Sequence, residues 1–97
     1  TLNIETITRI VCEHLGVAEN KIRDKTRKKE IVLARQIAMY LAKNLTLSSL
    51  KTIGLQFGGR DHSTVIHACN NIEEYKAQDL SFGKILDEIR MKVELSS

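Results

Sequence analysis

The 97-residue chain carries a formal net charge of +3 and is 42% apolar, with five glycines, no proline and two residues each of Tyr and Phe. This length suits one domain with a single core, and so few aromatic and turn residues argue against a β-rich fold. The charges at Glu5, Arg9 and Glu13 exclude a secretory signal, and the longest apolar run, 37–42, is too short to span a bilayer. We therefore expect one all-α domain over residues 1–97, located in the cytoplasm.

Hydrophobic periodicity predicts a first helix over about residues 4–15. Asn3 stands where an amino-terminal cap belongs, and Gly16 stands where a helix stops. Residues 17–22 have room for one short helical turn. The sequence KIRDKTRKKE at 21–30 is too highly charged to be buried, and it therefore predicts an exposed loop.

Strong helical periodicity from about residue 30 to residue 44, in a segment rich in good helix formers, predicts the central helix. A shorter helix of about ten residues follows, capped by Thr46 or Ser48 and ended by Gly58 and Gly59. Because glycine has access to backbone angles that other residues avoid, we expect the chain to turn sharply after this helix.

A long helix is predicted over 61–77, with Asp61 as its cap. A final helix begins after a cap at Asp79 or Ser81. Its predicted apolar stripe comprises Phe82, Ile85, Leu86, Ile89 and Val93. In total, about six helical segments with short connections are expected.

Charge is segregated along the chain. Residues 1–20 hold one basic and three acidic side chains, residues 21–51 hold nine and two, and residues 52–97 hold five and seven. The middle segment is therefore +7 and each flank is −2, as expected of a protein that meets a polyanion. A solvated charged face is the alternative that charge alone leaves open.

Residues 48–77 match the description of a helix-turn-helix, a unit that places its second helix in the major groove of DNA. The second helix starts with His62, Ser63 and Thr64, whose polar groups suit base edges and phosphates. Asp61 is expected to accept a hydrogen bond from the amide of Ser63 or Thr64, and its carboxylate also suits the amino group of cytosine. This segment is the predicted recognition helix.

The basic loop adds further DNA-binding chemistry. Arg27 is suited to a narrow A·T-rich minor groove, where the negative potential is greatest. Lys25, Lys28 and Lys29 are expected to contact phosphates without reading sequence. Arg60 and the amino-terminal end of the helix that follows it both favour a phosphate nearby.

Two segments, GGRDHSTVIHA at 58–68 and ARQIAMYLAK at 34–43, resemble the C-terminal DNA-binding domain (domain IV) of the bacterial chromosomal replication initiator family DnaA. The resemblance covers essentially the whole chain. It implies an all-α, Trp-repressor-like fold and sequence-specific binding of double-stranded DNA at DnaA boxes of a replication origin, broadly TTATNCACA, with one chain on each asymmetric site. It also implies that ATP is bound by another part of a longer protein, which agrees with a chain that begins at Thr1.

The same resemblance assigns roles to individual residues. Arg27 corresponds to the minor-groove arginine of the family. Arg35 corresponds to its phosphate-contacting arginine, and Gln36 corresponds to the glutamine beside it, which is also a DNA-binding position. The other DNA-binding positions that it implies are Lys43, Arg60, Asp61, His62, Ser63, Thr64 and His67.

Three departures from the family pattern modify these expectations. Ala34 stands where the family often has proline, which predicts an earlier start of the helix and a less fixed loop. Lys51 replaces another proline and adds a positive charge beside the duplex. Ser63 replaces a threonine and removes a methyl group, so a small shift in box preference is expected.

Other kinds of chemistry have little support in the sequence. His62 and His67 are five residues apart, which is not the spacing of a helical metal site, and Cys12 and Cys69 form no CxxC pair. Without a GxxxxGK[ST] sequence, the chain is not expected to be an enzyme or to hold a cofactor. Two rival functions stay open: the same type of domain borrowed by a transposase or phage protein, and a helical protein-interaction module whose basic loop docks an acidic partner.

Overall fold

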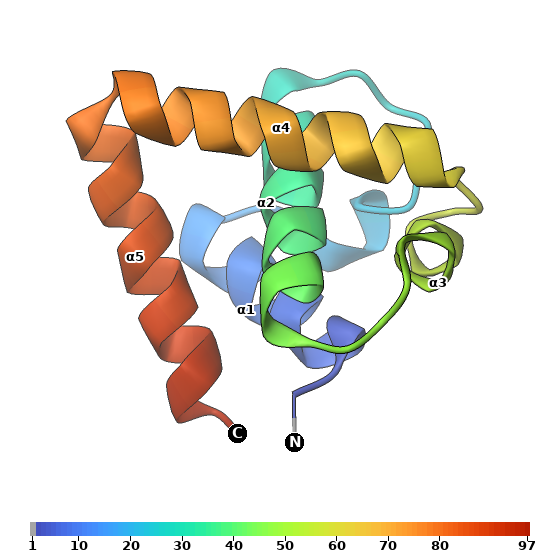
Figure 1. Cartoon of the computed structure of the whole chain (residues 1–97), viewed down its shortest axis with the longest axis horizontal. Coiled ribbons are helices and arrows are strands. Elements are labelled where there is room, and N and C mark those ends of the chain that lie inside the picture. Colours follow the sequence, from blue (N-terminus) through green and yellow to red (C-terminus); the bar gives the residue numbers. More distant parts are fainter. Residues whose placement is uncertain (1) are drawn as a thin grey trace.

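The computed structural model describes residues 2–97, which form five α-helices and one turn of 3-10 helix, without strands (Figure 1). The elements are α1 (Ile4–Leu15), η1 (Glu19–Lys21), α2 (Lys29–Leu45), α3 (Leu50–Gln56), α4 (His62–Gln78) and α5 (Leu80–Leu95). The all-α prediction is confirmed, but six helices is one too many. The short segment 17–22 closes only the i to i+3 hydrogen bonds of η1. Over residues 2–97, every helix is too short or too polar to cross a membrane.

The first helix, α1, begins and ends where the sequence predicts. The Oδ1 atom of Asn3 accepts from the Thr6 amide at 2.8 Å, and Gly16 ends the helix with a left-handed φ of 68°. Ile7 and Val11 lie fully buried on the inner face. The helix is therefore defined locally by its caps and held in place by its apolar stripe.

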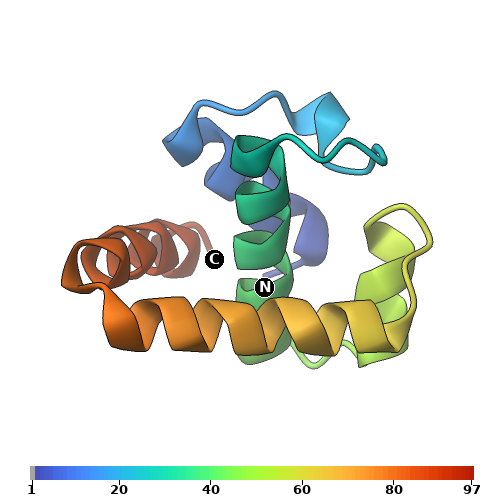
Figure 2. The same cartoon turned by 90° about the horizontal axis from the view of Figure 1, so that it is seen from above.

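The centre of the fold is α2, which packs against α1, α3 and α4. Figures 1 and 2 show α4 crossing α2 and extending past it on both sides, toward α3 at one end and α5 at the other. From there α5 returns to pack on α1. Small residues such as Ala34, Ala38 and Ala42 are buried on α2, so neighbouring helices approach it closely. The largest fully buried side chains elsewhere in the chain include Ile7, Ile22, Ile53, Phe57, Ile72 and Ile89.

The third helix differs from its prediction in both cap and length. It has seven residues rather than about ten, and Ser49, not Thr46 or Ser48, caps it by accepting from the Thr52 amide at 3.1 Å. Ser49 has the extended backbone that a cap requires. The hydroxyl of Thr46 instead donates to the Ala42 carbonyl at 2.6 Å, at the end of α2. Both predicted caps are therefore wrong.

Asp79 connects α4 to α5, as one of the two predicted caps. Its carboxylate accepts from the Phe82 amide at 3.1 Å, and the ring of Phe82 stacks on Tyr75 with centroids 4.1 Å apart. The predicted apolar stripe of α5 is correct except for Ile85, which is exposed. The helix turns Leu86, rather than its neighbour Ile85, into the core.

Candidate nucleic-acid interface

A tight turn joins α3 to α4. Gly58 and Gly59 adopt left-handed φ angles of 80° and 75°, as their sequence predicts. Gly54 closes the turn, because its carbonyl accepts from the Arg60 amide at 3.0 Å. A Cβ atom on Gly54 would lie 2.0 Å from the carbonyl oxygen of Arg60. Sequence reasoning missed Gly54, whose only signal is a glycine inside a helix.

Asp61 caps the first turn of α4. Its Oδ1 atom accepts from the Thr64 amide at 3.1 Å, from the Ser63 hydroxyl at 2.6 Å and from the Thr64 hydroxyl at 3.3 Å. These hydrogen bonds, led by the one from Ser63, lower the pKa of Asp61. The predicted cap is confirmed, with Thr64 as the amide donor. His62, Ser63 and Thr64 are all exposed.

The middle of α4 anchors this exposed tip. Val65, Ala68, Cys69 and Ile72 are buried at helical spacing, as the sequence predicts. Residues on the opposite face, including His67, are exposed. The helix is therefore fixed along one side while its polar first turn stands free for an approaching molecule.

The basic loop, residues 22–28, leads from η1 into α2. Lys25, Arg27 and Lys28 are exposed on it, and Lys29 is exposed in the first turn of α2. The charged residues of the loop are thus presented to solvent, as predicted. Ile22 at the start of the loop is fully buried and attaches it to the core.

Three arginines tie the start of this loop to the helix-turn-helix. Arg35 of α2 is buried, and it donates from Nε to the Ile22 carbonyl and from Nη2 to the Asp24 carbonyl, both at 2.8 Å. Arg60 donates from Nη2 to the same Asp24 oxygen at 2.9 Å, and from Nη1 to the carbonyl of Phe57.

Arg23 is the third member of this group. It donates from Nε to the Gln56 carbonyl at 2.7 Å, which joins the loop to the last residue of α3. Burial, followed by the nearby charge of Arg60, lowers the pKa of Arg35, and burial also lowers that of Arg60. Sequence reasoning missed Arg23, since its acceptor lies 33 residues away along the chain.

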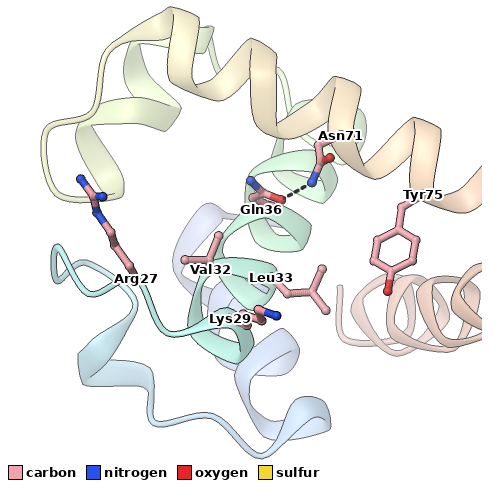
Figure 3. Close-up of a pocket in the computed structure, with 7 residues that line it drawn as sticks. All are labelled: Arg27, Lys29, Val32, Leu33, Gln36, Asn71 and Tyr75. Atoms are coloured by element: carbon pink, nitrogen blue, oxygen red, sulfur yellow. Dashed lines mark hydrogen bonds between the residues drawn. The ribbon is translucent and has the colours of Figure 1, made fainter.

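Gln36 and His67 lie on one continuous surface between α2 and α4. Gln36 lines an open pocket together with Arg27 and Tyr75, and it lines a second pocket together with His67 (Figure 3). The Nδ2 atom of Asn71 donates to Gln36 Oε1 at 2.7 Å. The structure thus brings together three of the expected DNA-binding residues, Arg27, Gln36 and His67, and adds Asn71, which the sequence did not single out.

Lys43 and Lys51 stand apart from that surface. Lys43 lies in the last turn of α2, at the end of the helix opposite the basic loop, and Lys51 lies in the first turn of α3. Both side chains are exposed. Their expected DNA contacts stay predictions.

Other reactive groups do not form a second site. Cys12 and Cys69 are buried free thiols, and burial, followed by the charge of Glu19, raises the pKa of Cys12 to about 11. In the part of the chain that the structure describes, no three His, Cys, Asp or Glu residues are grouped to hold a metal ion.

Comparison with known proteins identifies similar sequences. The family model described as the bacterial dnaA protein helix-turn-helix matches residues 4–72. The chromosomal replication initiator protein DnaA of Chlorobaculum tepidum is 52% identical over 96 residues, covering 99% of this chain and 20% of that protein. Its counterpart in Thermodesulfovibrio yellowstonii is 47% identical over 92 residues, covering 95% and 21%. The chain spans about a fifth of the length of these curated relatives.

Proposed function

Because this chain belongs to the bacterial DnaA helix-turn-helix family, we propose that it binds double-stranded DNA sequence-specifically, at boxes of the form TTATNCACA in a replication origin. In this proposal the first turn of α4 enters the major groove and Arg27 enters the adjacent minor groove at the A·T-rich half of the box. One chain occupies each asymmetric site, and binding supports the initiation of replication. ATP binding belongs to other parts of the longer relatives.

The observation that carries this proposal is the exposed and capped first turn of α4. Asp61 fixes the backbone of the turn, so His62, Ser63 and Thr64 are held outward on a helix whose opposite face lies in the core. A recognition helix needs this combination of rigid support and exposed polar groups.

The positive loop supports the same conclusion. It carries Arg27, Lys25 and Lys28 in exposed positions, and phosphate contacts from such residues provide affinity without sequence information. Arg60 is half-buried and Arg35 is buried, and both donate to main-chain carbonyls. The phosphate contacts expected for these two arginines stay predictions, while their structural contacts need no DNA.

Fluorescence anisotropy with a box duplex and a scrambled duplex tests the proposal. His62→Ala and Ser63→Ala are each expected to cost about 1–3 kcal/mol on the box and to reduce discrimination, because they remove base contacts. Lys28→Ala should weaken binding to both duplexes alike, because it removes a phosphate contact. Equal losses on both duplexes for the α4 variants would contradict direct readout.

A salt titration separates this function from docking to an acidic protein. For a DNA-binding domain, log Kd depends linearly on log salt concentration, with a slope of about 0.9 for each neutralised phosphate. The preference for the box over scrambled DNA should persist at every salt concentration. If scrambled DNA competes as well as the box throughout, the protein-interaction alternative gains.

A further inference from the structure

We propose that Arg23, Arg35 and Arg60 form a brace that fixes the basic loop relative to α4, and so sets the spacing between the two halves of the DNA site. Arg23 is a positioning residue in this brace rather than a DNA contact. The inference rests on the proposed function, since it concerns how the two DNA-reading elements are held in register.

The first connection runs from the core to the loop. Arg35 projects from α2 and donates to the carbonyls of Ile22 and Asp24, both at 2.8 Å. The residue is only 6% exposed, so most of its guanidinium is enclosed by the fold. Because both acceptors belong to the main chain, these bonds position the backbone of the loop and not merely a side chain.

The second connection runs from the turn between α3 and α4 to the carbonyl oxygen of Asp24. Arg60 precedes α4 and donates to the Asp24 carbonyl at 2.9 Å, and it also donates to the carbonyl of Phe57. The carbonyl oxygen of Asp24 therefore joins the loop to α2 through Arg35 and to the helix-turn-helix through Arg60. Hydrogen bonds from a charged guanidinium are stronger than neutral ones.

The third connection comes from the loop itself. Arg23 donates to the carbonyl of Gln56 at 2.7 Å. The carbonyl oxygen of Arg23 also lies close to the turn: a Cβ atom added to Gly58 would lie 2.5 Å from it. The loop and the turn thus touch through main-chain atoms as well as through the arginine, and Figure 2 shows the loop reaching toward the segment between α3 and α4.

The remaining loop contacts do not fix this geometry. Among residues 22–28, the other hydrogen bonds that the structure shows are local. The amides of Ile22 and Asp24 donate to Glu19 and Lys21, and the Lys28 amide donates to the Thr26 hydroxyl. The Lys28 carbonyl accepts from the Ile31 and Val32 amides in the first turn of α2, which fixes the end of the loop to α2 but not to α4. Arg27 lies three residues after Asp24, and its distance from the tip of α4 therefore depends on the brace. If the brace is weakened, we expect Arg27 to lose its register with α4.

A one-base-pair insertion measures this register. An insertion at N in TTATNCACA moves the A·T-rich half away from the CACA half by about 3.4 Å and rotates it by about 35°. If Arg27 and the first turn of α4 are held at a fixed distance, the protein cannot contact both halves of the inserted box at once. We expect the wild-type chain to bind the inserted box about tenfold more weakly than the box.

The experiment compares Arg23→Ala with Lys21→Ala by fluorescence anisotropy on the box, the inserted box and a scrambled duplex. Lys21 is exposed two residues away, and its side chain makes only a long, exposed ion pair with the Asp24 carboxylate at 4.0 Å. The control therefore removes the same charge without removing an arginine-to-carbonyl bond of the brace. We expect the ratio of box to inserted-box affinity to fall at least threefold in Arg23→Ala and to stay at the wild-type value in Lys21→Ala. Arg23→Lys, which keeps the charge but lacks the planar Nε donor, should reduce the ratio in the same direction.

The salt dependence distinguishes positioning from a phosphate contact. The slope of log Kd against log salt should be the same for Arg23→Ala as for Lys21→Ala, whereas loss of a direct phosphate contact would lower it by about 0.9. A wild-type spacing ratio in Arg23→Ala, or a slope reduced by that amount, overturns the brace while the proposed function stands. Equal wild-type binding to box and scrambled DNA overturns the proposed function itself.

Discussion

Asn71 of α4 donates from Nδ2 to the Oε1 atom of Gln36 on α2, so the acceptor end of the Gln36 amide is held toward α4 (Figure 3). We propose that the Nε2 donor of Gln36 contacts DNA, since the family resemblance implies a DNA-binding role for this residue. Asn71→Ala should therefore weaken box binding by about 1 kcal/mol, because Gln36 loses its orientation.

Asn71→Asp should weaken box binding more than Asn71→Ala does. A carboxylate cannot donate to Gln36 Oε1, and it favours the reversed orientation of the Gln36 amide, with Nε2 toward α4. Asn70→Asp is the matched control, since it introduces the same charge at the exposed neighbouring position. Anisotropy titrations that give equal losses for the two aspartate variants would show that charge alone, and not the orientation of Gln36, is responsible.

The close approach of Gly54 to the Arg60 carbonyl predicts that replacing Gly54 by alanine lowers the stability of the protein, whereas the same change at Gly83 raises it. Gly54→Ala should destabilise the protein by about 2 kcal/mol or more, since its Cβ would overlap main-chain atoms that have little room to move. Gly83→Ala should stabilise it by about 0.5–1 kcal/mol, because Gly83 is helical and its Cβ would meet only ordinary contacts at 3.9 Å. Urea denaturation measures both, and a similar effect of the two variants would contradict the packing argument.

The lowered pKa of Asp61 predicts an acid-dependent loss of stability. Since the folded state favours the carboxylate, its contribution is fully present above the ordinary pKa of 3.8 and is lost as the pH falls through the lower pKa of the folded state. Thermal unfolding of wild type and Asp61→Asn at a series of pH values isolates this contribution, because asparagine caps the helix without titrating. The difference in Tm between the two should shrink as the pH falls through that window, and a constant difference would exclude the linkage.

The buried thiols should be unreactive in the native protein. With its pKa raised to about 11, Cys12 has so little thiolate at pH 8 that its reaction with a disulfide reagent should be about 100-fold slower than that of a free cysteine. Burial raises the pKa of Cys69 as well. Absorbance during labelling should show both thiols reacting only after denaturation, and rapid labelling of native protein would contradict this.

Features of the fold that depend on neighbouring residues could be predicted from the sequence, whereas those that depend on distant partners could not. The cap at Asp61, the turn at Gly58 and the buried stripe of α4 all lie within residues 58–72, where capping and periodicity act directly. The cap of α3 was not identified because three hydroxyl residues precede that helix, and only the packed backbone shows which one is extended.

The arginines show the same limit at the candidate site. A guanidinium binds phosphate oxygens and main-chain carbonyls with similar geometry. The sequence around Arg35 and Arg60 therefore does not indicate which kind of acceptor each arginine binds. Their shared acceptor, the carbonyl of Asp24, is 11 residues from one and 36 from the other. Only the folded chain brings the three residues together.

The hydroxyl groups of Ser63 and Thr64, in the first turn of α4, have a fixed hydrogen-bonding direction. Ser63 and Thr64 both direct their protons to the carboxylate of Asp61, and what remains on the outward side of each oxygen is a lone pair. Lone pairs match the exocyclic amines of adenine and cytosine and are repelled by the ring nitrogen and carbonyl of guanine. The cap therefore does more than begin a helix: in the proposed complex, it makes these two side chains acceptors toward DNA.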